Sequence, residues 1–345
     1  MNKKKILITG SAGFIGFHSA KFLLSKNFKV YGIDNLDDYY DVRIKKQRLS
    51  ILNKNNLFKF CKFNILNYNK LKLLFKKNRF TYVLHLAAQA GVRYSFINPK
   101  KYIDTNINGF FNVINLSNEY KIKHFLYASS SSVYGLHKNK VSKEADDVNH
   151  PTSLYGATKR SNELIAHTYS HLHDLRTSGL RFFTVYGQYG RPDMSIFKFF
   201  KNNITNKKNF IFNYGNHQRS FTYIDDVVSA IYKIIVKKNK KSKKKLTKLY
   251  PDENLKNNFN IVNVGNDQVV KLSDVIQKIE NITKKKFKNL FLPLQKGDVI
   301  GSKASSKKLK NNFDFKFKTN ISSGLKLFYK WFLNYKKFNI NLKSK

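Results

Sequence analysis

Tyr155 and Lys159 stand four residues apart in a segment with helical character, and a run of serines, Ser129–Ser132, precedes them. Residues four apart on a helix share one face. A lysine ammonium so placed favours the phenolate form of the tyrosine, whose pKa is ordinarily about 10, and moves it towards use as a general base. A serine hydroxyl on a preceding strand can polarise the same substrate oxygen. This arrangement predicts removal of a proton from a secondary alcohol, a reaction that needs a hydride acceptor.

A glycine-rich segment near the N-terminus predicts where that acceptor binds. Gly10, Gly13 and Gly16 follow a short apolar run at residues 6–9 and open a segment with helical spacing. Glycines let the backbone turn tightly and bring amide groups and a helix N-terminus against a pyrophosphate. Asp34 closes the second expected strand, where a carboxylate accepts hydrogen bonds from the adenosine ribose and repels a 2′-phosphate. The pattern predicts NAD rather than NADP, although the glycines alone also fit a plain strand-to-helix turn.

Alternating apolar strands and helical stretches predict an α/β fold with a Rossmann-type, doubly wound parallel sheet. The expected strands are 6–9, 29–33, 58–63, 82–86, 125–129 and 177–183, and the expected helices are 14–24, 68–77, 102–119 and 155–171. Later elements are expected at 195–203, 221–236, 259–264 and 322–335. Residues 1–190 are therefore predicted to form an NAD-binding domain that carries the catalytic residues. Residues 191–345 are predicted to form mainly a smaller C-terminal substrate-binding lobe, with some return to the main domain and a lysine-rich insertion at 237–258.

The net charge of +44 raises the possibility of nucleic-acid or acidic-membrane binding. Nearly all the positive charge is lysine, however, and the chain is also rich in Asn, Ile, Phe and Tyr. These residues share A/T-rich codons, so a compositional bias of the genome explains the charge without a partner. Because no recognition module interleaves with the basic runs, no specific nucleic-acid partner is expected.

Two further features concern the compartment. No apolar run reaches the roughly 18 residues of a membrane span, so no membrane insertion is expected. Cys61 is the single cysteine, which excludes internal disulfides and fits a reducing compartment. The sequence therefore predicts a cytoplasmic protein.

Three histidines near the end of the expected catalytic helix require a test for metal binding. His167 and His171 are spaced like zinc ligands on a helix, and His173 lies close by. No glutamate follows His167 and no cysteine cluster is near, which favours a helix surface or a subunit contact. We predict no metal site.

Taken in order, the glycine-rich segment, Asp34, the serine run, Tyr155 and Lys159 make the chain resemble the extended short-chain dehydrogenase/reductase family. More narrowly, it is similar to the NAD-dependent nucleotide-sugar 4-epimerases, and among these to the UDP-glucuronate 4-epimerases. The segments that carry this narrower resemblance are 32–42, 85–95, 180–187, 190–194, 221–226 and 297–299. The resemblance spans nearly the whole chain and leaves out mainly the lysine-rich insertion and the C-terminal tail.

The resemblance implies a role for each reactive residue. Tyr155 would take the proton from the sugar 4-hydroxyl while NAD accepts the hydride from carbon 4, Lys159 would hold the nicotinamide ribose, and Ser130 would hydrogen-bond the reacting oxygen. The 4-keto sugar would then turn over before the hydride returns to its other face. The implied cofactor-binding positions are Gly10, Gly13, Phe14, Ile15, Gly16, Asp34, Asn35, Asn64, Ile65, Leu86, Ala87, Ala88, Asn106, Tyr155 and Lys159. The resemblance also implies a homodimer formed through the helix of Tyr155 and its neighbour.

Substrate choice is expected to depend on arginines and hydroxyl groups. Oxidation of glucuronate at carbon 4 places a ketone beta to the carboxylate, an arrangement prone to lose carbon dioxide. A guanidinium clamps a carboxylate in bidentate fashion, and Arg191 is the first candidate for this role, with a surface ion pair as the alternative. The other expected substrate-binding residues are Arg93, Ser131, Ser132, Thr184 and Arg219.

Ser131 and Ser132 also separate the chain from related enzymes. The similar sugar 4,6-dehydratases carry an Asp-Glu pair at these positions, and decarboxylating relatives carry a glutamate at the second. Serine hydroxyls do not act as acids near neutral pH, so dehydration and decarboxylation are disfavoured. The sequence predicts UDP-glucuronate 4-epimerisation; UDP-glucose or UDP-N-acetylglucosamine 4-epimerisation, or a catalytically idle NAD-binding protein with a protein or nucleic-acid partner, stay open as alternatives.

Overall fold

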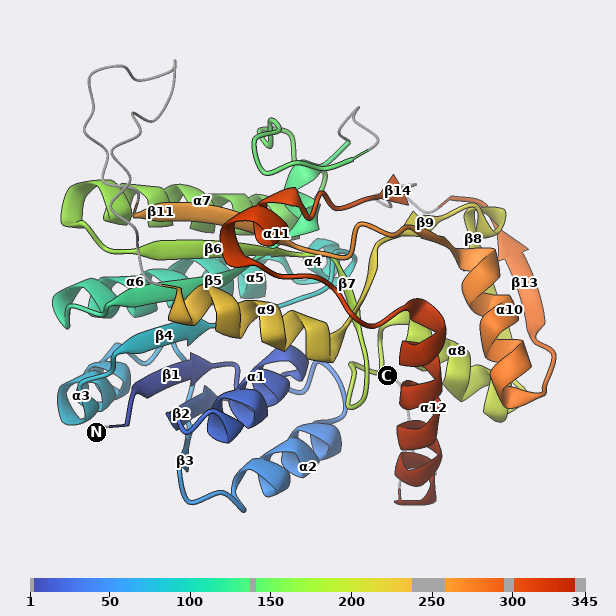
Figure 1. The fold of residues 1–345 in the computed structure, drawn as a ribbon, viewed down its shortest axis with the longest axis horizontal. Helices are drawn as coiled ribbons and strands as arrows, with labels where there is room; N and C mark the ends of the chain where they lie inside the picture. The colour runs from blue at the N-terminus through green and yellow to red at the C-terminus, as the bar shows by residue number, and fades with distance from the viewer. Residues whose placement is uncertain (1–2, 137–140, 238–257, 295–300, 339–345) are drawn as a thin grey trace.

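A seven-stranded parallel sheet forms the centre of the computed structural model, which describes residues 3–136, 141–237, 258–294 and 301–338 (Figure 1). Its strands are β1 (Lys5–Thr9), β2 (Lys29–Asp34), β3 (Phe58–Lys62), β4 (Tyr82–His85), β5 (His124–Ser130), β6 (Thr177–Phe182) and β11 (Phe259–Val264). The strand order is β11-β6-β5-β4-β1-β2-β3, so the order reverses beside β1. This arrangement confirms the predicted doubly wound sheet and places a ligand crevice at the carboxyl end of β1.

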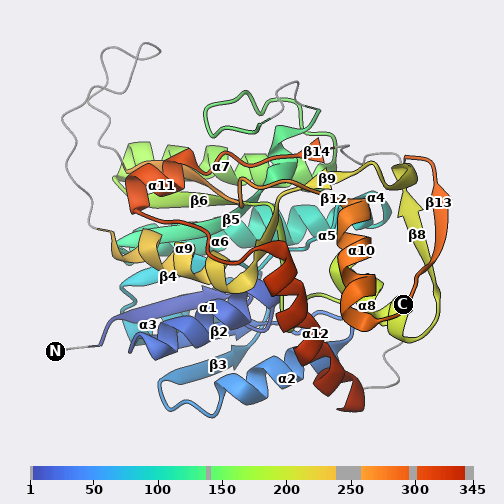
Figure 2. The same ribbon diagram turned by 45° about the vertical axis from the view of Figure 1, so that its right-hand side comes forward.

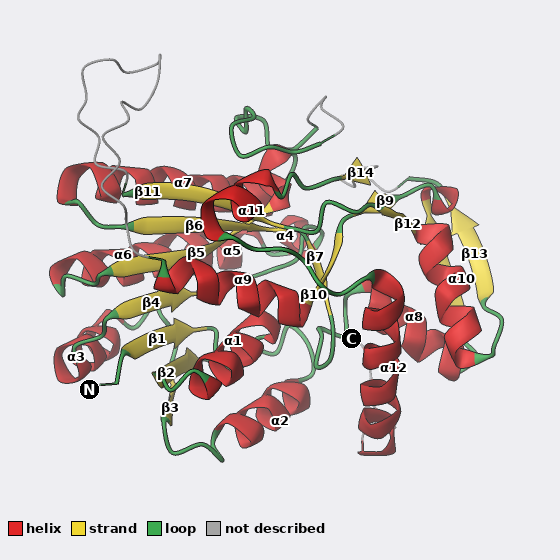
Figure 3. Ribbon diagram, in the orientation of Figure 1, coloured by secondary structure: helices red, strands yellow, loops and turns green. Residues whose placement is uncertain are grey.

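Helices cover both faces of the sheet (Figure 3). One face packs against α1 (Phe14–Ser25), α2 (Val42–Leu52), α9 (Ile224–Val236) and α11 (Lys307–Phe313), and the other against α3 (Tyr68–Asn78), α6 (Gly109–Glu119) and α7 (Leu154–His173). Alternate strand residues serve the two layers, because successive side chains point to opposite faces. In β1, for example, Ile6 and Ile8 join the first layer and Leu7 joins the second.

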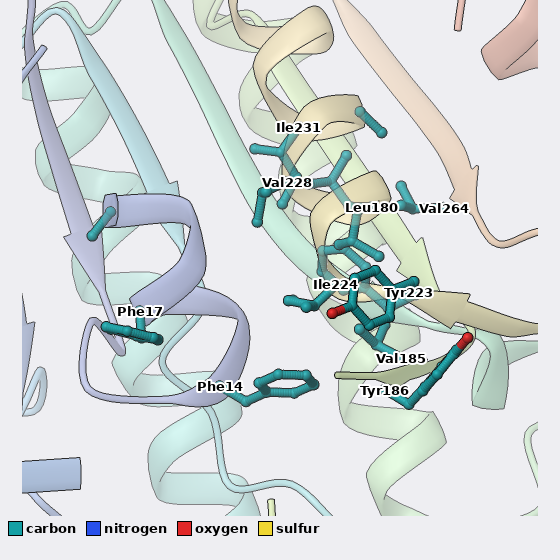
Figure 4. Close-up of a cluster of buried hydrophobic side chains, with 14 of the residues drawn as sticks. Phe14, Phe17, Leu180, Val185, Tyr186, Tyr223, Ile224, Val228, Ile231 and Val264 are labelled. Carbon is teal, nitrogen blue, oxygen red and sulfur yellow. The ribbon is translucent and has the colours of Figure 1, made fainter. Parts of the chain in front are cut away.

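The core beside α1 fixes the start of that helix. Phe14 and Phe17 of α1 lie in one buried cluster with Ile224 and Val228 of α9, and Figure 4 draws part of this cluster. Phe14 is the first residue of α1 and is only 6% exposed. Burial of a side chain of this size contributes about 1.5–3 kcal/mol, which holds the adjoining glycine-rich turn in place.

A smaller lobe lies beyond the carboxyl ends of the main strands (Figures 1 and 2). It contains α8 (Ser195–Ile204), α10 (Leu272–Thr283), α12 (Ile321–Phe338) and the parallel pair β8 (Lys208–Phe212) and β13 (Lys288–Leu292). Aromatic side chains join α8 to α12. Phe197 of α8 contacts Phe328 and Trp331 of α12 edge to face, and Trp331 packs partly buried against the core.

The remaining elements are short and lie after the main strands or within the smaller lobe. They are α4 (Tyr94–Ile97), α5 (Pro99–Ile103), η1 (Asp104–Asn108), η2 (Ser131–Tyr134), β7 (Thr184–Tyr186), η3 (Asn213–Gly215), β9 (Gln218–Arg219), β10 (Phe221–Tyr223), β12 (Val270–Lys271) and β14 (Gly301–Ser302). The helix expected at 102–119 is divided, because η1 inserts a π-helical turn between α5 and α6. Most of the lysine-rich insertion, 238–257, and the 297–299 segment lie outside the described residues. The domain boundary at residue 190 stays a prediction.

Candidate active site

A cavity of about 530 Å³ lies at the carboxyl ends of the main strands. Parallel strands bring their carboxyl ends to one edge of the sheet, so residues distant in sequence meet there. Most of the predicted site residues line this cavity: Gly10, Gly13, Phe14, Ile15, Gly16, Asp34, Asn35, Asn64, Ile65, Leu86, Ala87, Ala88, Ser130, Ser131, Ser132, Tyr155, Lys159, Thr184, Arg191 and Arg219.

The glycine-rich turn between β1 and α1 requires glycine at two positions. Gly10 has a φ of +72°, and a Cβ there would lie 2.7 Å from the backbone nitrogen of Ala87. A Cβ at Gly16 would lie 2.1 Å from the carbonyl oxygen of Gly10. The bare backbone leaves the N-terminus of α1 open to the cavity, where amide groups and the helix dipole attract a phosphate group. These residues therefore fit the pyrophosphate of a dinucleotide.

Asp34 fastens the turn to the next segment. Its two carboxylate oxygens accept hydrogen bonds from the backbone amides of Ala12, at 3.0 Å, and Leu36, at 2.8 Å. The side chain is buried at the cavity wall. A carboxylate has about four lone-pair sites, so these two bonds leave acceptor capacity for ribose hydroxyls. Asp34 thus has a structural role in the turn besides the cofactor contact that its position predicts.

Tyr155 and Lys159 lie on the first turns of α7, and both line the cavity. The helix begins here because the Ser153 hydroxyl accepts the backbone amide of Gly156 at 3.1 Å, which is an N-cap. A Cβ at Gly156 would lie 2.7 Å from the backbone oxygen of Ser132, so glycine allows α7 to approach the serine run. The sequence pattern thus explains both the start of the helix and the nearness of Tyr155 to the serines.

The electrostatics of this pair differ from the sequence-based expectation that Lys159 lowers the pKa of Tyr155. Burial raises the pKa of Tyr155, and the groups that oppose this increase are the Ser130 hydroxyl, through a hydrogen bond, and the Arg191 charge. Lys159 is 2% exposed and its ammonium donates to the carbonyl oxygen of Ala128 at 3.0 Å. Burial lowers the pKa of Lys159 to about 8. The expected lowering of the Tyr155 pKa by Lys159 therefore does not hold in this structure, because burial is the largest effect and Lys159 is not among the groups that oppose it.

The serine run points in two directions from the end of β5. The Ser130 hydroxyl accepts the backbone amide of Ser132 at 3.1 Å and donates to the Ser132 hydroxyl at 3.2 Å. The Ser129 hydroxyl donates to Glu163 at 2.6 Å instead. Glu163 is fully buried on α7 and forms two 2.8 Å bonds with the Arg181 guanidinium. This ion pair anchors α7 to the sheet below the cavity.

Two predicted site residues are not among the described residues that line the cavity. Asn106 is 1% exposed, and its amide bonds the backbone of Gln89 and the hydroxyl of Thr158. It therefore supports the wall rather than forming it. Arg93 is exposed at the start of α4, with its guanidinium 5.2 Å from the ring centroid of Phe212. Its contact with substrate stays a prediction.

Several cavity residues were missed by sequence reasoning. Asp37, Tyr39, Tyr40 and Lys45 reach the cavity from the segment after β2. Large side chains among the others are Phe63, Gln89, Tyr134, Phe182, Phe183, Met194 and Lys303. The segment 32–42 was noted for its resemblance only, and nothing in its spacing indicated a cavity wall. Glu163 had a usable signal, because it follows Lys159 by four residues and so shares its helix face.

Metal and membrane features add nothing to the site. Within the described ranges, no three His, Cys, Asp or Glu side chains are grouped so that they could hold a metal ion. His167 and His171 lie exposed on α7, with parallel rings 6.4 Å apart. None of the helices that the structure describes combines the length and apolar character that a membrane crossing requires.

The chain is similar in sequence to known proteins over most of its length. Residues 6–249 match the model of the "NAD dependent epimerase/dehydratase family". The chain is 46% identical over 334 residues to "Protein CapI" of Staphylococcus aureus, which covers 96% of this chain and 99% of that protein. It is 39% identical over 335 residues to "UDP-glucuronate 4-epimerase 4" of Arabidopsis thaliana, covering 96% of this chain and 75% of the relative.

A solved structure agrees over nearly the whole fold. The UDP-glucuronic acid 4-epimerase from Bacillus cereus, crystallised with UDP-glucuronic acid and NAD, superimposes with a TM-score of 0.85. It is 30% identical, and the match covers 96% of this chain and 99% of that one. The similarity includes the main sheet and the smaller lobe, because it extends well beyond residue 190.

Proposed function

The chain belongs to the NAD dependent epimerase/dehydratase family and is an NAD-dependent UDP-sugar 4-epimerase, and on that premise we propose that its substrate is UDP-glucuronate, which it converts to UDP-galacturonate. The observation that carries this proposal is the presence of Arg191 in the wall of the cavity that Tyr155 also lines. Ser131 and Ser132 line the same cavity and bring no carboxylate to repel a sugar acid.

The reacting proton belongs to Tyr155 in this proposal. Bound NAD would supply a reversible hydride acceptor for carbon 4 of the sugar, which is the chemistry that a change of configuration at that carbon requires. The phenolate oxygen of Tyr155 takes the 4-hydroxyl proton as the carbon–oxygen double bond forms, and gives it back on the return step. Ser130 lines the same cavity, and its hydroxyl hydrogen-bonds the reacting oxygen of the sugar in this proposal. Protons and electrons balance within the cycle, so the net reaction is an isomerisation.

The chain's own residues also hold the cofactor in this proposal. The turn from Gly10 to Gly16 would hold the pyrophosphate, Asp34 would accept hydrogen bonds from the adenosine ribose hydroxyls, and the Lys159 ammonium would donate to the nicotinamide ribose. Lys159 retains N–H donors for this purpose, because an ammonium has three and the carbonyl of Ala128 takes one.

Arg191 controls the fate of the 4-keto sugar. A ketone at carbon 4 activates loss of the carboxylate when the bond to the carboxyl carbon aligns with the carbonyl π system. A guanidinium that fixes the carboxylate in two hydrogen bonds holds that bond away from alignment. The cavity thus has a means to permit epimerisation and suppress decarboxylation.

The direct test is incubation of the purified protein with NAD and UDP-glucuronate, followed by separation of the products. We expect UDP-galacturonate to form until the two UDP-sugars reach equilibrium. Carbon dioxide should be released at well below a tenth of the rate of epimerisation. UDP-glucose in parallel reactions is the matched neutral substrate, and we expect at least about tenfold lower kcat/KM for it. Turnover of UDP-glucose without turnover of UDP-glucuronate would overturn the proposal.

A neutral sugar is the second candidate, and one observation favours it. Arg191 is paired with Asp193 in the structure, and this carboxylate offsets the positive charge that a sugar acid needs. UDP-glucose or UDP-N-acetylglucosamine would require no such charge. The five N–H groups of a guanidinium leave room for a second carboxylate, however, and so we prefer UDP-glucuronate.

We also propose a homodimer formed through α6 and α7. Large apolar side chains are exposed on this side of the molecule, including Phe111 at 47%, Leu164 at 53% and Leu172 at 65%. Sedimentation velocity should give twice the mass of the 40.3 kDa chain at micromolar concentration. Leu164→Lys with Leu172→Lys should return the monomer, because two buried lysines would face apolar surface. A wild-type protein that sediments as a monomer would contradict the proposal.

A further inference from the structure

Asp193 contacts Arg191 from one side of the guanidinium. The Nε of Arg191 donates to one carboxylate oxygen at 3.0 Å, and an Nη donates to the other in a still closer contact. The Asp193 side chain is 28% exposed and that of Arg191 is 20% exposed, so the pair is largely shielded from water. Such a bidentate pair fixes the orientation of the planar guanidinium as well as its position.

Tyr39 completes the arrangement from the segment after β2. Its hydroxyl donates to Asp193 at 3.3 Å, and its ring centroid lies 5.8 Å from the central carbon of Arg191. Burial, and after it the charge of Asp193, raises the pKa of Tyr39, so its phenol stays protonated and able to donate near neutral pH. Two side chains from distant segments, Asp193 and Tyr39, therefore hold one guanidinium.

The backbone that leads to Arg191 is held independently. Arg48 is fully buried, and its guanidinium donates to the carbonyl oxygens of Ala12, Tyr189 and Gly190. This links the glycine-rich turn to the residues before Arg191. Because the main chain before Arg191 is already fixed, the remaining conformational freedom is that of the Arg191 side chain. The contact with Asp193 restricts this freedom.

Arg191 and Tyr39 belong to the cavity wall, whereas Asp193 is not among the described residues that line it. Asp193 therefore contacts Arg191 without itself lining the cavity. It uses two of the five guanidinium N–H groups, one on Nε and one on an Nη nitrogen. The other three stay available at the opposite edge, which is itself a two-pronged site for a carboxylate.

We propose that Asp193 is a positioning residue that orients Arg191 towards the sugar carboxylate and thereby determines specificity for an acidic sugar. This inference rests on the proposed function, since Arg191 needs an oriented free edge only if the substrate carries a carboxylate. Asp193 keeps its contact while substrate binds, so the two carboxylates occupy different edges of one guanidinium.

Asp193→Asn tests the inference, because asparagine keeps the shape and one acceptor but loses the charge. We expect the KM for UDP-glucuronate to rise about tenfold, while the inhibition constant of UDP, which lacks the sugar, changes by less than about twofold. Carbon dioxide released per epimerisation should also rise, since a loosely held carboxylate can rotate into alignment. Tyr39→Phe removes the supporting hydrogen bond only and should cause a smaller change in the same direction.

Glu119→Gln is the matched control, since Glu119 forms an exposed ion pair with Lys72 on the α3 and α6 side of the sheet. It should leave both constants unchanged. If Asp193→Asn lowers the KM for UDP-glucuronate, the aspartate competes with the substrate for Arg191 and the inference fails. The inference also fails if the inhibition constant of UDP rises as much as the KM for UDP-glucuronate, or if neither constant changes. Failure of the proposed function itself would appear in the wild-type protein, as turnover of UDP-glucose without turnover of UDP-glucuronate.

Discussion

Replacement of Tyr155 by phenylalanine is expected to lower turnover of the UDP-sugar by about 10³-fold, because it removes the only atom placed to take the substrate proton in the proposed mechanism. The ring of Tyr155 contacts Tyr102 edge to face at 6.2 Å, a contact that phenylalanine retains. The fold and the cavity should therefore persist. Turnover measured by product separation, with NAD affinity measured by calorimetry, distinguishes the loss of a base from the loss of a site.

The pH dependence of kcat/KM provides a second test of the same variant. Burial raises the pKa of Tyr155, so the free protein holds a protonated phenol near neutral pH. Wild-type kcat/KM should therefore rise with pH as the phenolate fraction increases. The residual activity of Tyr155→Phe should lack this rise.

Tyr169→Phe is the matched control on the same helix, since its hydroxyl donates to Asn115 rather than lining the cavity. We expect its turnover to match that of the wild type. Retention of more than a tenth of wild-type turnover in Tyr155→Phe would remove Tyr155 from the role of base. A loss of NAD binding together with turnover would instead assign it to the cofactor site.

The main sheet was predictable because most of its strands are short runs rich in apolar residues, and β1, for example, is followed directly by Gly10. The strand expected at 6–9 is observed as Lys5–Thr9, and the helix expected at 155–171 is observed as Leu154–His173. Both errors lie at element ends, where capping rather than periodicity decides the boundary. The local pattern of apolar residues was sufficient to predict an element wherever its buried residues are also its hydrophobic ones.

The helix α2 was missed for the opposite reason. Its buried residues include Lys45 and Arg48, so the buried face does not appear apolar in the sequence. Arg48 is buried because three backbone carbonyl groups accept its guanidinium, and these come from residues 12, 189 and 190. No local pattern encodes contacts over such separations. The pairing of β8 with β13 was missed for the same reason.

At the site, the types of the residues were predictable from the sequence, but the burial and the contacts of each residue were not. Most of the site residues predicted from residue type and order line the cavity, including Tyr155 and Lys159. The effect of Lys159 on Tyr155 was not predictable, because it depends on how deeply each group is buried. Asp193 was quoted within a motif but given no role, since its contact with Tyr39 joins residues 154 positions apart.

Replacement of Lys159 by methionine is expected to stabilise the ligand-free protein while it lowers turnover by about 10²-fold. A fall of the Lys159 pKa from 10.5 to about 8 on burial corresponds to about 3 kcal/mol against the charged form in the folded state. Methionine removes this cost. It also leaves the carbonyl of Ala128 without its lysine donor, which costs about 1 kcal/mol. Urea unfolding at pH 7 should therefore show a net gain of about 2 kcal/mol.

The pH dependence of this gain identifies its cause. Below pH 8 the lysine is protonated in both the folded and the unfolded chain, so the whole cost is present. Between pH 8 and 10.5 the folded chain releases its proton first, the unfolded state binds more protons, and wild-type stability rises with pH relative to the variant. The gain from methionine should accordingly shrink over this interval and vanish near its upper end. Lys59→Met, at an exposed position of β3, should give little change at any pH. A gain for Lys159→Met that stays constant up to pH 10.5 would show that packing, and not the buried charge, is responsible.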